Sequence, residues 1–154
     1  MTHDEIRIEG CQRLDRIRQQ MHEANLDALL IYSQREVMWL MCRDIPNYHT
    51  NSAVVISPVD GQPVLLIRFG FDIPRARALS WFDDIRSVDG DHPGGLLEQS
   101  LETAVRMGLD KATIGLVAGD DTVDEISLSL TRSLQQGLPR AQIRQVTEII
   151  TRMG

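Results

Sequence analysis

The segment Arg43–Thr50 brings together the side chains best suited to bind a polar ligand. It carries a carboxylate, a phenol and an imidazole, on Asp44, Tyr48 and His49, beside the guanidinium of Arg43. Recognition residues of α/β proteins are often found on such connections between a helix and a strand. Asn, Asp and Pro also favour loops for purely local reasons, so a solvated loop is the alternative.

Arginines that follow a later apolar run could bind an anion close to that segment. Arg68 ends the run, and Arg75 and Arg77 come shortly after it. Surface guanidinium groups more commonly pair with carboxylates of the same protein, which is the alternative here. We retain Arg68, at the end of a predicted strand, as a candidate for ligand recognition.

Two acidic clusters could hold a divalent ion, but each has a simpler explanation. Asp89 and Asp91 lie beside His92, yet the neighbouring glycines and Pro93 favour a turn in which Asp91 caps the next helix. The acidic run Gly119–Glu125 lacks EF-hand spacing and suits the N-terminus of a helix, where the dipole favours carboxylates. We therefore predict no metal site in this chain.

The common signatures of catalysis are missing from the sequence. It has no phosphate-binding GxxxxGK[ST] loop, no GxGxxG turn after the first strand, no GxSxG elbow and no HExxH helix. The four histidines are scattered, without the i, i+4 spacing that holds a metal on one helix face. Because no base, nucleophile and metal set converges, we predict that this chain alone has no catalytic residue, no cofactor and no enzymatic activity.

Composition and charge restrict the class of protein. The 154 residues are 42% hydrophobic and 25% charged, which indicates one folded domain over residues 1–154. The formal net charge of -6 argues against a nucleic-acid partner. No apolar run approaches the ~18 residues of a membrane span and no signal peptide is recognisable, so we expect a cytoplasmic protein without a membrane partner. Cys11 and Cys42 are expected to be two buried, reduced thiols.

Periodicity predicts an amphipathic lead helix, then a buried strand and a second helix. Apolar residues recur at helical spacing over about 5–24, on a surface otherwise made of Arg, Gln, Asp and Glu, and Asn25 suits a left-handed stop. Ala28–Tyr32 is an apolar run typical of a strand buried on both faces. Ser33 and Glu36 then have the spacing of a capping box at a helix start.

The remainder of the chain alternates strands and helices. Ser52–Ser57 and Pro63–Phe69 flank an Asp-Gly turn and predict a hairpin. The other elements expected are helices entered at Pro74, from about Gly94 to Met107 and from about Thr122 to Gln136, and strands at Ile85–Val88, Ala112–Val117 and Ile143–Val146. Six strands with helices between most of them predict an α/β protein with a mixed sheet and helices on both faces.

These elements, in this order, resemble the N-terminal domain of the creatinase/prolidase family of metal-dependent hydrolases. That family includes creatinase, proline dipeptidases, aminopeptidase P and ectoine hydrolase-like enzymes. The stretches that carry the resemblance run along nearly the whole chain: Arg13–Met21, Asn25–Tyr32, Ser33–Leu40, Ala53–Leu65 and Ala112–Val117. The resemblance implies a three-layer α/β/α fold with a six-stranded mixed sheet and a ribonuclease H-like motif.

The chain departs from the family pattern after the first strand, where members resemble Ser-Pro-x-Asn-Ile-x-Tyr-Leu-Thr-Gly. Glu36 stands where the Asn is expected, and Trp39 stands where the Tyr is expected. Met41 and Cys42 replace the Thr-Gly pair that precedes the polar segment. Trp39 and Leu40 preserve the apolar contact, whereas the loss of Thr-Gly separates this chain from a close match to the proline peptidases.

The resemblance implies that the chemistry lies outside this chain. In the family a second, C-terminal pita-bread domain binds two metal ions through two Asp, one His and two Glu, and these metals activate water. Residues 1–154 end before such a domain, and Glu148–Gly154 is expected to begin the connector to it. The N-terminal domain is implied to support dimer contacts and to shape the partner subunit's active site. The candidates for shaping substrate choice are Asp44, Tyr48, His49 and Arg68.

Two hypotheses from different classes follow. The first is a non-catalytic N-terminal domain of a creatinase- or Xaa-Pro dipeptidase-like hydrolase, which assists C-N bond hydrolysis in a peptide or a small amidine or amide substrate. Its expected partners are a second copy of the chain and the C-terminal catalytic domain, and a dinuclear divalent metal cofactor would belong to that second domain. The alternative is a free-standing small-ligand or protein-interaction module that reuses the fold. Fold alone does not distinguish the two.

Overall fold

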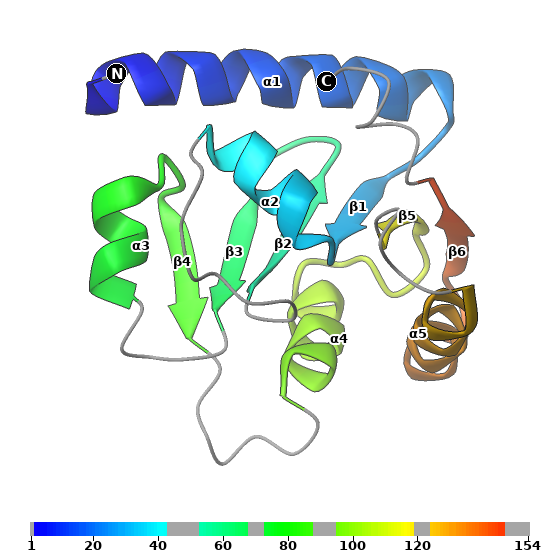
Figure 1. Ribbon diagram of the computed structural model, residues 1–154. Helices are drawn as coiled ribbons and strands as arrows, with labels where there is room; N and C mark the ends of the chain where they lie inside the picture. Colours follow the sequence, from blue (N-terminus) through cyan, green and yellow to red (C-terminus); the bar gives the residue numbers. More distant parts are fainter. Residues whose placement is uncertain (1, 43–52, 68–72, 88–94, 119–123, 147–154) are drawn as a thin grey trace.

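The computed structural model describes residues 2–42, 53–67, 73–87, 95–118 and 124–146, with backbone only at 73, 75, 79 and 124–128. Its helices are α1 (His3–Glu23), α2 (Gln34–Met41), α3 (Ile73–Leu79), α4 (Leu96–Arg106) and α5 (Asp124–Gly137). Its strands are β1 (Ala28–Ile31), β2 (Ala53–Pro58), β3 (Val64–Ile67), β4 (Asp84–Ser87), β5 (Thr113–Val117) and β6 (Gln142–Gln145). Their order agrees with the prediction from sequence, and the ends differ by only a few residues (Figure 1).

The strands form one six-stranded sheet in the order β4-β3-β2-β1-β5-β6. β1 is parallel to β5, β5 to β6 and β3 to β4, whereas β2 is antiparallel to both β1 and β3. β2 and β3 are the predicted hairpin, and Gly61 in its turn has a φ of 101°, which glycine adopts without a steric penalty. The sheet is therefore mixed, as predicted.

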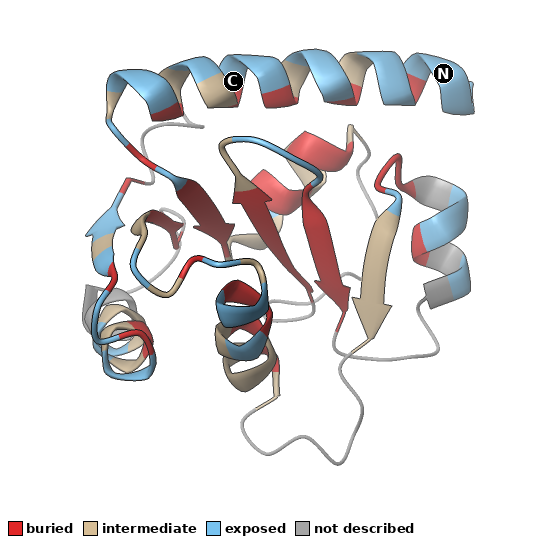
Figure 2. Cartoon of the chain, turned by 180° about the vertical axis from the view of Figure 1, so that it is seen from behind, coloured by how far each residue is buried: buried red, intermediate tan, exposed pale blue. Residues whose placement is uncertain are grey.

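Helices cover both faces of the sheet. Successive side chains of a strand point to opposite faces, so Leu29 and Ile31 pack with α1, α2 and α3, while Leu30 packs with α4 and α5. Figure 2 shows the central strands buried along their length, while α1, α4 and α5 turn their exposed surfaces away from the sheet. The predicted three-layer α/β/α architecture is confirmed.

α1 is a 21-residue amphipathic helix that spans the width of the domain (Figure 1). Thr2 caps its N-terminus by accepting a hydrogen bond from the Glu5 N–H at 3.2 Å, and Asn25 follows its end with a φ of 57°. Its apolar stripe enters the core through four side chains: Ile6, Leu14, Ile17 and Met21. Among the helices in the described ranges, none combines the length and the apolarity needed to cross a membrane.

Two details of the sequence prediction are wrong. Ser33 is the N-cap residue of α2, but its hydroxyl donates to the Glu36 carboxylate and makes no capping bond to the backbone. The expected capping box is therefore replaced by a side-chain pair. Cys11 is exposed because it falls outside the apolar stripe of α1, and Cys42 is half-buried, so the two free thiols are not both buried.

Candidate functional site

The segments that carry the predicted site residues lie outside the described part of the chain: Asp44, Tyr48 and His49 in 43–52, Arg68 in 68–72, and the acidic clusters in 88–94 and 119–123. The structure shows where the chain enters and leaves these segments. Cys42 precedes the first of them and Ala53 follows it. Ala53 pairs with Ile67, the residue before Arg68. The chain therefore leaves the sheet toward His49 and toward Arg68 from neighbouring points.

All of these segments join the same edge of the sheet. The parallel strands β1, β3, β4 and β5 end at this edge, because Ile31 pairs with Val117 and Ile67 pairs with Ser87. β2 runs the other way and begins there, at Ala53. Open α/β sheets bind their ligands outside the carboxyl ends of their parallel strands. This edge is therefore the candidate functional site.

Within this edge, β1 and β5 are neighbouring strands whose helices depart to opposite faces. α2 follows β1 and shares a core with α1, whereas α5 follows β5 and shares the other core with α4. The backbone N–H groups of Tyr32 and Ser33 both donate to the Val117 carbonyl, at 2.9 and 3.2 Å, which ties the two strand ends together. Such a reversal is the position at which doubly wound sheets bind ligands.

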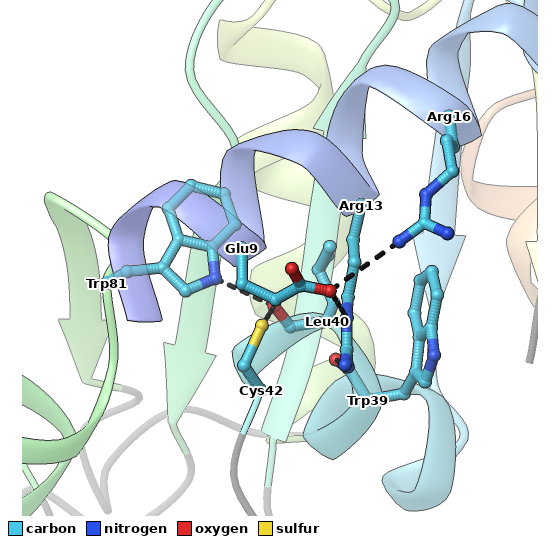
Figure 3. Close-up of polar contacts among 7 residues, drawn as sticks. All are labelled: Glu9, Arg13, Arg16, Trp39, Leu40, Cys42 and Trp81. Carbon is cyan, nitrogen blue, oxygen red and sulfur yellow. Dashed lines mark hydrogen bonds and ion pairs between the residues drawn. The ribbon is translucent and has the colours of Figure 1, made fainter. Parts of the chain in front are cut away.

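The end of α2, which leads into the first undescribed segment, is held by side chains from other elements (Figure 3). Carbonyl groups in the last turn of a helix have no partner within the helix. Here the Trp39 carbonyl accepts from the capping Cys42 N–H at 3.1 Å and also from Arg13 of α1, and the Leu40 carbonyl accepts from Nε1 of Trp81 at 2.7 Å. Cys42 ends the helix with a φ of 60°, and its Sγ lies 3.7 Å from the same Leu40 oxygen.

Arg13 makes three contacts that fix its guanidinium. Besides the bond to the Trp39 carbonyl, its Nε donates to Oε1 of Glu9 at 3.1 Å, and that oxygen lies 3.7 Å from Arg16. The guanidinium carbon stands 5.0 Å from the centre of a Trp39 ring, within the range of a cation–π interaction. Because α2 has no basic residue in its own last turn, Arg13 supplies the positive charge that favours a helix C-terminus.

Trp81 reaches Leu40 because residue 10 of α1 is a glycine. An ideally placed Cβ on Gly10 would overlap the indole of Trp81. The Trp81 side chain is buried and stacks on Phe82, with 4.6 Å between the ring centres. A buried indole N–H needs an acceptor, and the Leu40 carbonyl supplies it. Gly10, Arg13 and Trp81 are called the α2 clamp below.

Burial perturbs two titratable side chains next to this edge. It raises the pKa of Tyr32 to about 12, and the nearby Ser100 side chain offsets part of that rise. Among the described residues the Tyr32 hydroxyl has no partner at hydrogen-bond distance, and Ser100 donates to the Leu96 carbonyl at 2.5 Å. Burial also raises the pKa of the Cys42 thiol, against the opposing effect of Arg13. Both groups are therefore protonated near neutral pH and are unsuited to act as a nucleophile or a base.

The described ranges contain no group of three or more His, Cys, Asp or Glu side chains that could hold a metal ion. The cluster Asp89–His92 lies outside those ranges, so the choice there between a turn and an ion site stays a prediction. α5 begins at Asp124, inside the acidic run Gly119–Glu125, as expected for carboxylates placed at a helix N-terminus.

The sequence does not predict the α2 clamp. Its helical periodicity places the polar side chains of the lead helix on the surface, whereas only 22% of the Arg13 side chain is exposed. Gly10 was a usable signal, because glycine in a helix interior costs about 1 kcal/mol relative to alanine and calls for a packing reason. Trp81 gave no such signal, since its acceptor, Leu40, lies 41 positions away in the sequence.

Solved structures of peptidases share this fold. The chain matches the Xaa-Pro dipeptidase from Bacillus anthracis with a TM-score of 0.70 and 13% identity, over 94% of this chain and 35% of that chain. It matches the N-terminal domain of the cytoplasmic peptidase PepQ from Mycobacterium tuberculosis H37Rv with a TM-score of 0.67 and 17% identity, over 93% and 98%. It matches the aminopeptidase P from Streptococcus thermophilus with a TM-score of 0.67 and 18% identity, over 94% and 98%.

At these identities the structural likeness establishes the fold alone. The chain spans 35% of the length of the Bacillus anthracis dipeptidase and almost all of the other two structures. No curated protein sequence matches it significantly. The family model of the Creatinase/Prolidase N-terminal domain matches residues 13–153, a range that includes all six strands of the sheet. The chain therefore belongs to the creatinase/prolidase N-terminal domain family.

Proposed function

We propose that this chain is the non-catalytic N-terminal domain of a metal-dependent hydrolase of the creatinase or Xaa-Pro dipeptidase type. In this role it supports dimerisation and shapes the active site of the partner subunit for hydrolysis of a C-N bond. The observation that carries the proposal is the family match over residues 13–153. The Bacillus anthracis neighbour, which is an Xaa-Pro dipeptidase, suggests a short proline-containing peptide as the first substrate class to test.

The described residues favour a supporting role at the candidate edge. Tyr32 and Cys42 are held in their protonated forms by burial, which raises the pKa of each. What the edge offers is a firm attachment for the segments that follow: the Ala53–Ile67 pair on one side and the clamped end of α2 on the other. The metal chemistry of such a hydrolase would belong to a catalytic domain outside residues 1–154, with its dinuclear divalent site held there.

We assign substrate shaping to the four polar candidates named from the sequence: Asp44, Tyr48, His49 and Arg68. Their carboxylate, phenol, imidazole and guanidinium groups can recognise the charged ends of a dipeptide or a small zwitterion. The pairing of Ala53 with Ile67 supports action on one ligand, because the two segments that carry these residues leave the sheet from neighbouring points.

The test uses the product of the complete reading frame that contains this chain, purified with its metal. We expect hydrolysis of an Xaa-Pro dipeptide or a small amide, and a dimer in sedimentation equilibrium. Asp44→Asn, His49→Gln and Arg68→Lys should each raise KM by roughly tenfold or more, because a hydrogen bond to a charged group contributes about 1.5–3 kcal/mol. Metal content should not change.

Matched substitutions on other surfaces control for a general effect. His22→Gln on α1 and Arg106→Lys on α4 replace exposed residues of the same types and should leave KM unchanged. A wild-type KM in all of the site variants would remove the shaping role. A reading frame without a further domain, together with no hydrolysis, would favour the free-standing binding module instead.

A further inference from the structure

We infer that the α2 clamp sets the direction in which the chain leaves α2, so that Arg13 and Trp81 are positioning residues for substrate binding. The structural part of this inference stands on contacts between described residues. Its effect on substrate binding rests on the proposed function, in which the residues after Cys42 contact the substrate. Arg13 and Trp81 would act through the backbone of α2 and would not touch the substrate themselves.

α2 has few means of its own for holding its C-terminal end. Its eight residues fall below the length at which an isolated helix is stable in water. Ser33 provides no side-chain cap at its start, and its last turn has no basic residue. Cys42 adopts a left-handed backbone conformation at its end, which is unfavourable for a residue with a Cβ. Within α2 the Cys42 N–H donates to the Met38 and Trp39 carbonyls, and contacts with other elements add to these backbone bonds.

The α2 clamp supplies those contacts from two separate directions (Figure 3). Arg13 comes from α1 and engages both the carbonyl and the ring of Trp39. Trp81 comes from the connection between α3 and β4 and donates to the carbonyl of Leu40. Trp39 and Leu40 lie three and two positions before Cys42, so a shift of either carbonyl reorients the peptide planes at which the chain leaves the helix.

The guanidinium of Arg13 suits this task better than an ammonium group. Its planar fork donates to Glu9 and to the Trp39 carbonyl at the same time and keeps its face against the Trp39 ring. A lysine at this position would keep the charge but lose the simultaneous contacts. Arg13→Lys therefore tests whether the geometry of the guanidinium is needed in addition to its charge. Trp81→Phe removes the indole donor while keeping an aromatic ring.

The same two parts of the chain offer a matched control. Arg7 of α1 pairs with Asp83, two positions after Trp81, with 2.9 Å between the guanidinium nitrogen and the carboxylate oxygen. This pair also connects α1 to the segment between α3 and β4, but both side chains are exposed and their hydrogen bonds are to each other. Ile17→Val serves as a second control, because it weakens the buried face of α1, in the core that also holds Leu40, without removing a polar contact at the end of α2.

The first experiment is hydrogen–deuterium exchange on the 154-residue chain. In Arg13→Lys and in Trp81→Phe, the peptide that ends α2 at Cys42 should exchange about fivefold faster or more, while peptides from β1 and β5 keep their wild-type rates. Arg7→Gln should leave the α2 peptide unchanged. Unchanged exchange in the two clamp variants would overturn the inference, as would equal acceleration in Ile17→Val, since that would show a global effect.

The second experiment measures steady-state kinetics of the complete enzyme. Arg13→Lys and Trp81→Phe should raise KM severalfold with kcat and metal content unchanged, while Arg7→Gln and Ile17→Val keep the wild-type KM. Faster exchange with an unchanged KM would overturn the positioning role. If the wild-type protein hydrolyses no substrate, the proposed function fails, and the exchange experiment alone decides whether the clamp fixes the end of α2.

Discussion

Replacing Gly10 with alanine should destabilise the domain, although alanine is the better helix former. In an exposed helix this substitution would stabilise by about 1 kcal/mol. At Gly10 the new methyl group would overlap the indole of Trp81. That indole has little room to move, because it is 4% exposed, stacks on Phe82 and donates to the Leu40 carbonyl. Either α1 or the ring must therefore shift.

The magnitude follows from three contributions. Overpacking of a filled site costs about 1–3 kcal/mol. Displacement of Trp81 from the Leu40 carbonyl leaves a buried donor unsatisfied, which costs about 1–3 kcal/mol more when the bond is lost completely. The gain in helix propensity offsets about 1 kcal/mol of the sum. We expect a net destabilisation of about 3 kcal/mol, the middle of the resulting range of about 1–5 kcal/mol, which for a domain of this size lowers Tm by roughly 6–12 °C.

Urea unfolding followed by far-UV circular dichroism gives the free energies, and a double-mutant cycle with Trp81→Ala isolates the cause. In the Trp81→Ala background the obstacle is gone, so Gly10→Ala should stabilise by up to about 1 kcal/mol. The sign of the effect should therefore reverse between the two backgrounds. A Gly10→Ala protein as stable as the wild type would refute the reasoning, and so would the same loss of stability in both backgrounds.

Two further predictions concern the ends of β1 and α2. The pKa of Tyr32 is raised from 10.0 to about 12, so its neutral form contributes stability that is complete below pH 10 and lost as the pH rises through 12. From about pH 9 to about pH 11 the wild type should lose about 1 kcal/mol more free energy of unfolding than Tyr32→Phe, and parallel curves would contradict this. Cys42→Gly should be about 1 kcal/mol more stable than Cys42→Ala, because both lack the thiol and only glycine adopts a φ of 60° freely. Equal midpoints in urea would exclude strain at this position.

The sequence predicts those parts of the fold that depend on local pattern. The run Ala28–Tyr32 reads as a strand because each of its apolar side chains enters one of the two cores. The Asp-Gly turn predicts the β2–β3 hairpin because Gly61 tolerates a positive φ. The order of the strands in the sheet is not local: the Asp27 carboxylate accepts from the Thr113 N–H at 2.8 Å across 86 positions. The periodicity of the sequence does not predict that pairing.

The candidate site shows the same contrast between what local sequence pattern predicts and what depends on long-range contacts. The segments that carry His49 and Arg68 are joined to one edge of the sheet, because Ala53, which follows the first segment, pairs with Ile67, which precedes the second. The roles of the four polar candidates stay predictions, because these residues lie outside the described chain. The α2 clamp was not predicted, because the sequence does not distinguish Arg13, which contacts Trp39 in the structure, from an ordinary surface arginine.

Cys42 is a position at which this chain departs from the family pattern. The family pattern described above has a glycine at this position, and Cys42 has a φ of 60°, a conformation that favours glycine. The contacts of Arg13 and Trp81 help to hold the end of α2 in this conformation, although the residue there carries a Cβ. The matched structures share the fold at 13–18% identity, so few of their side chains are the same as those of this chain. The proposed function assigns substrate choice to side chains that follow this turn, and steady-state kinetics with this protein tests that assignment.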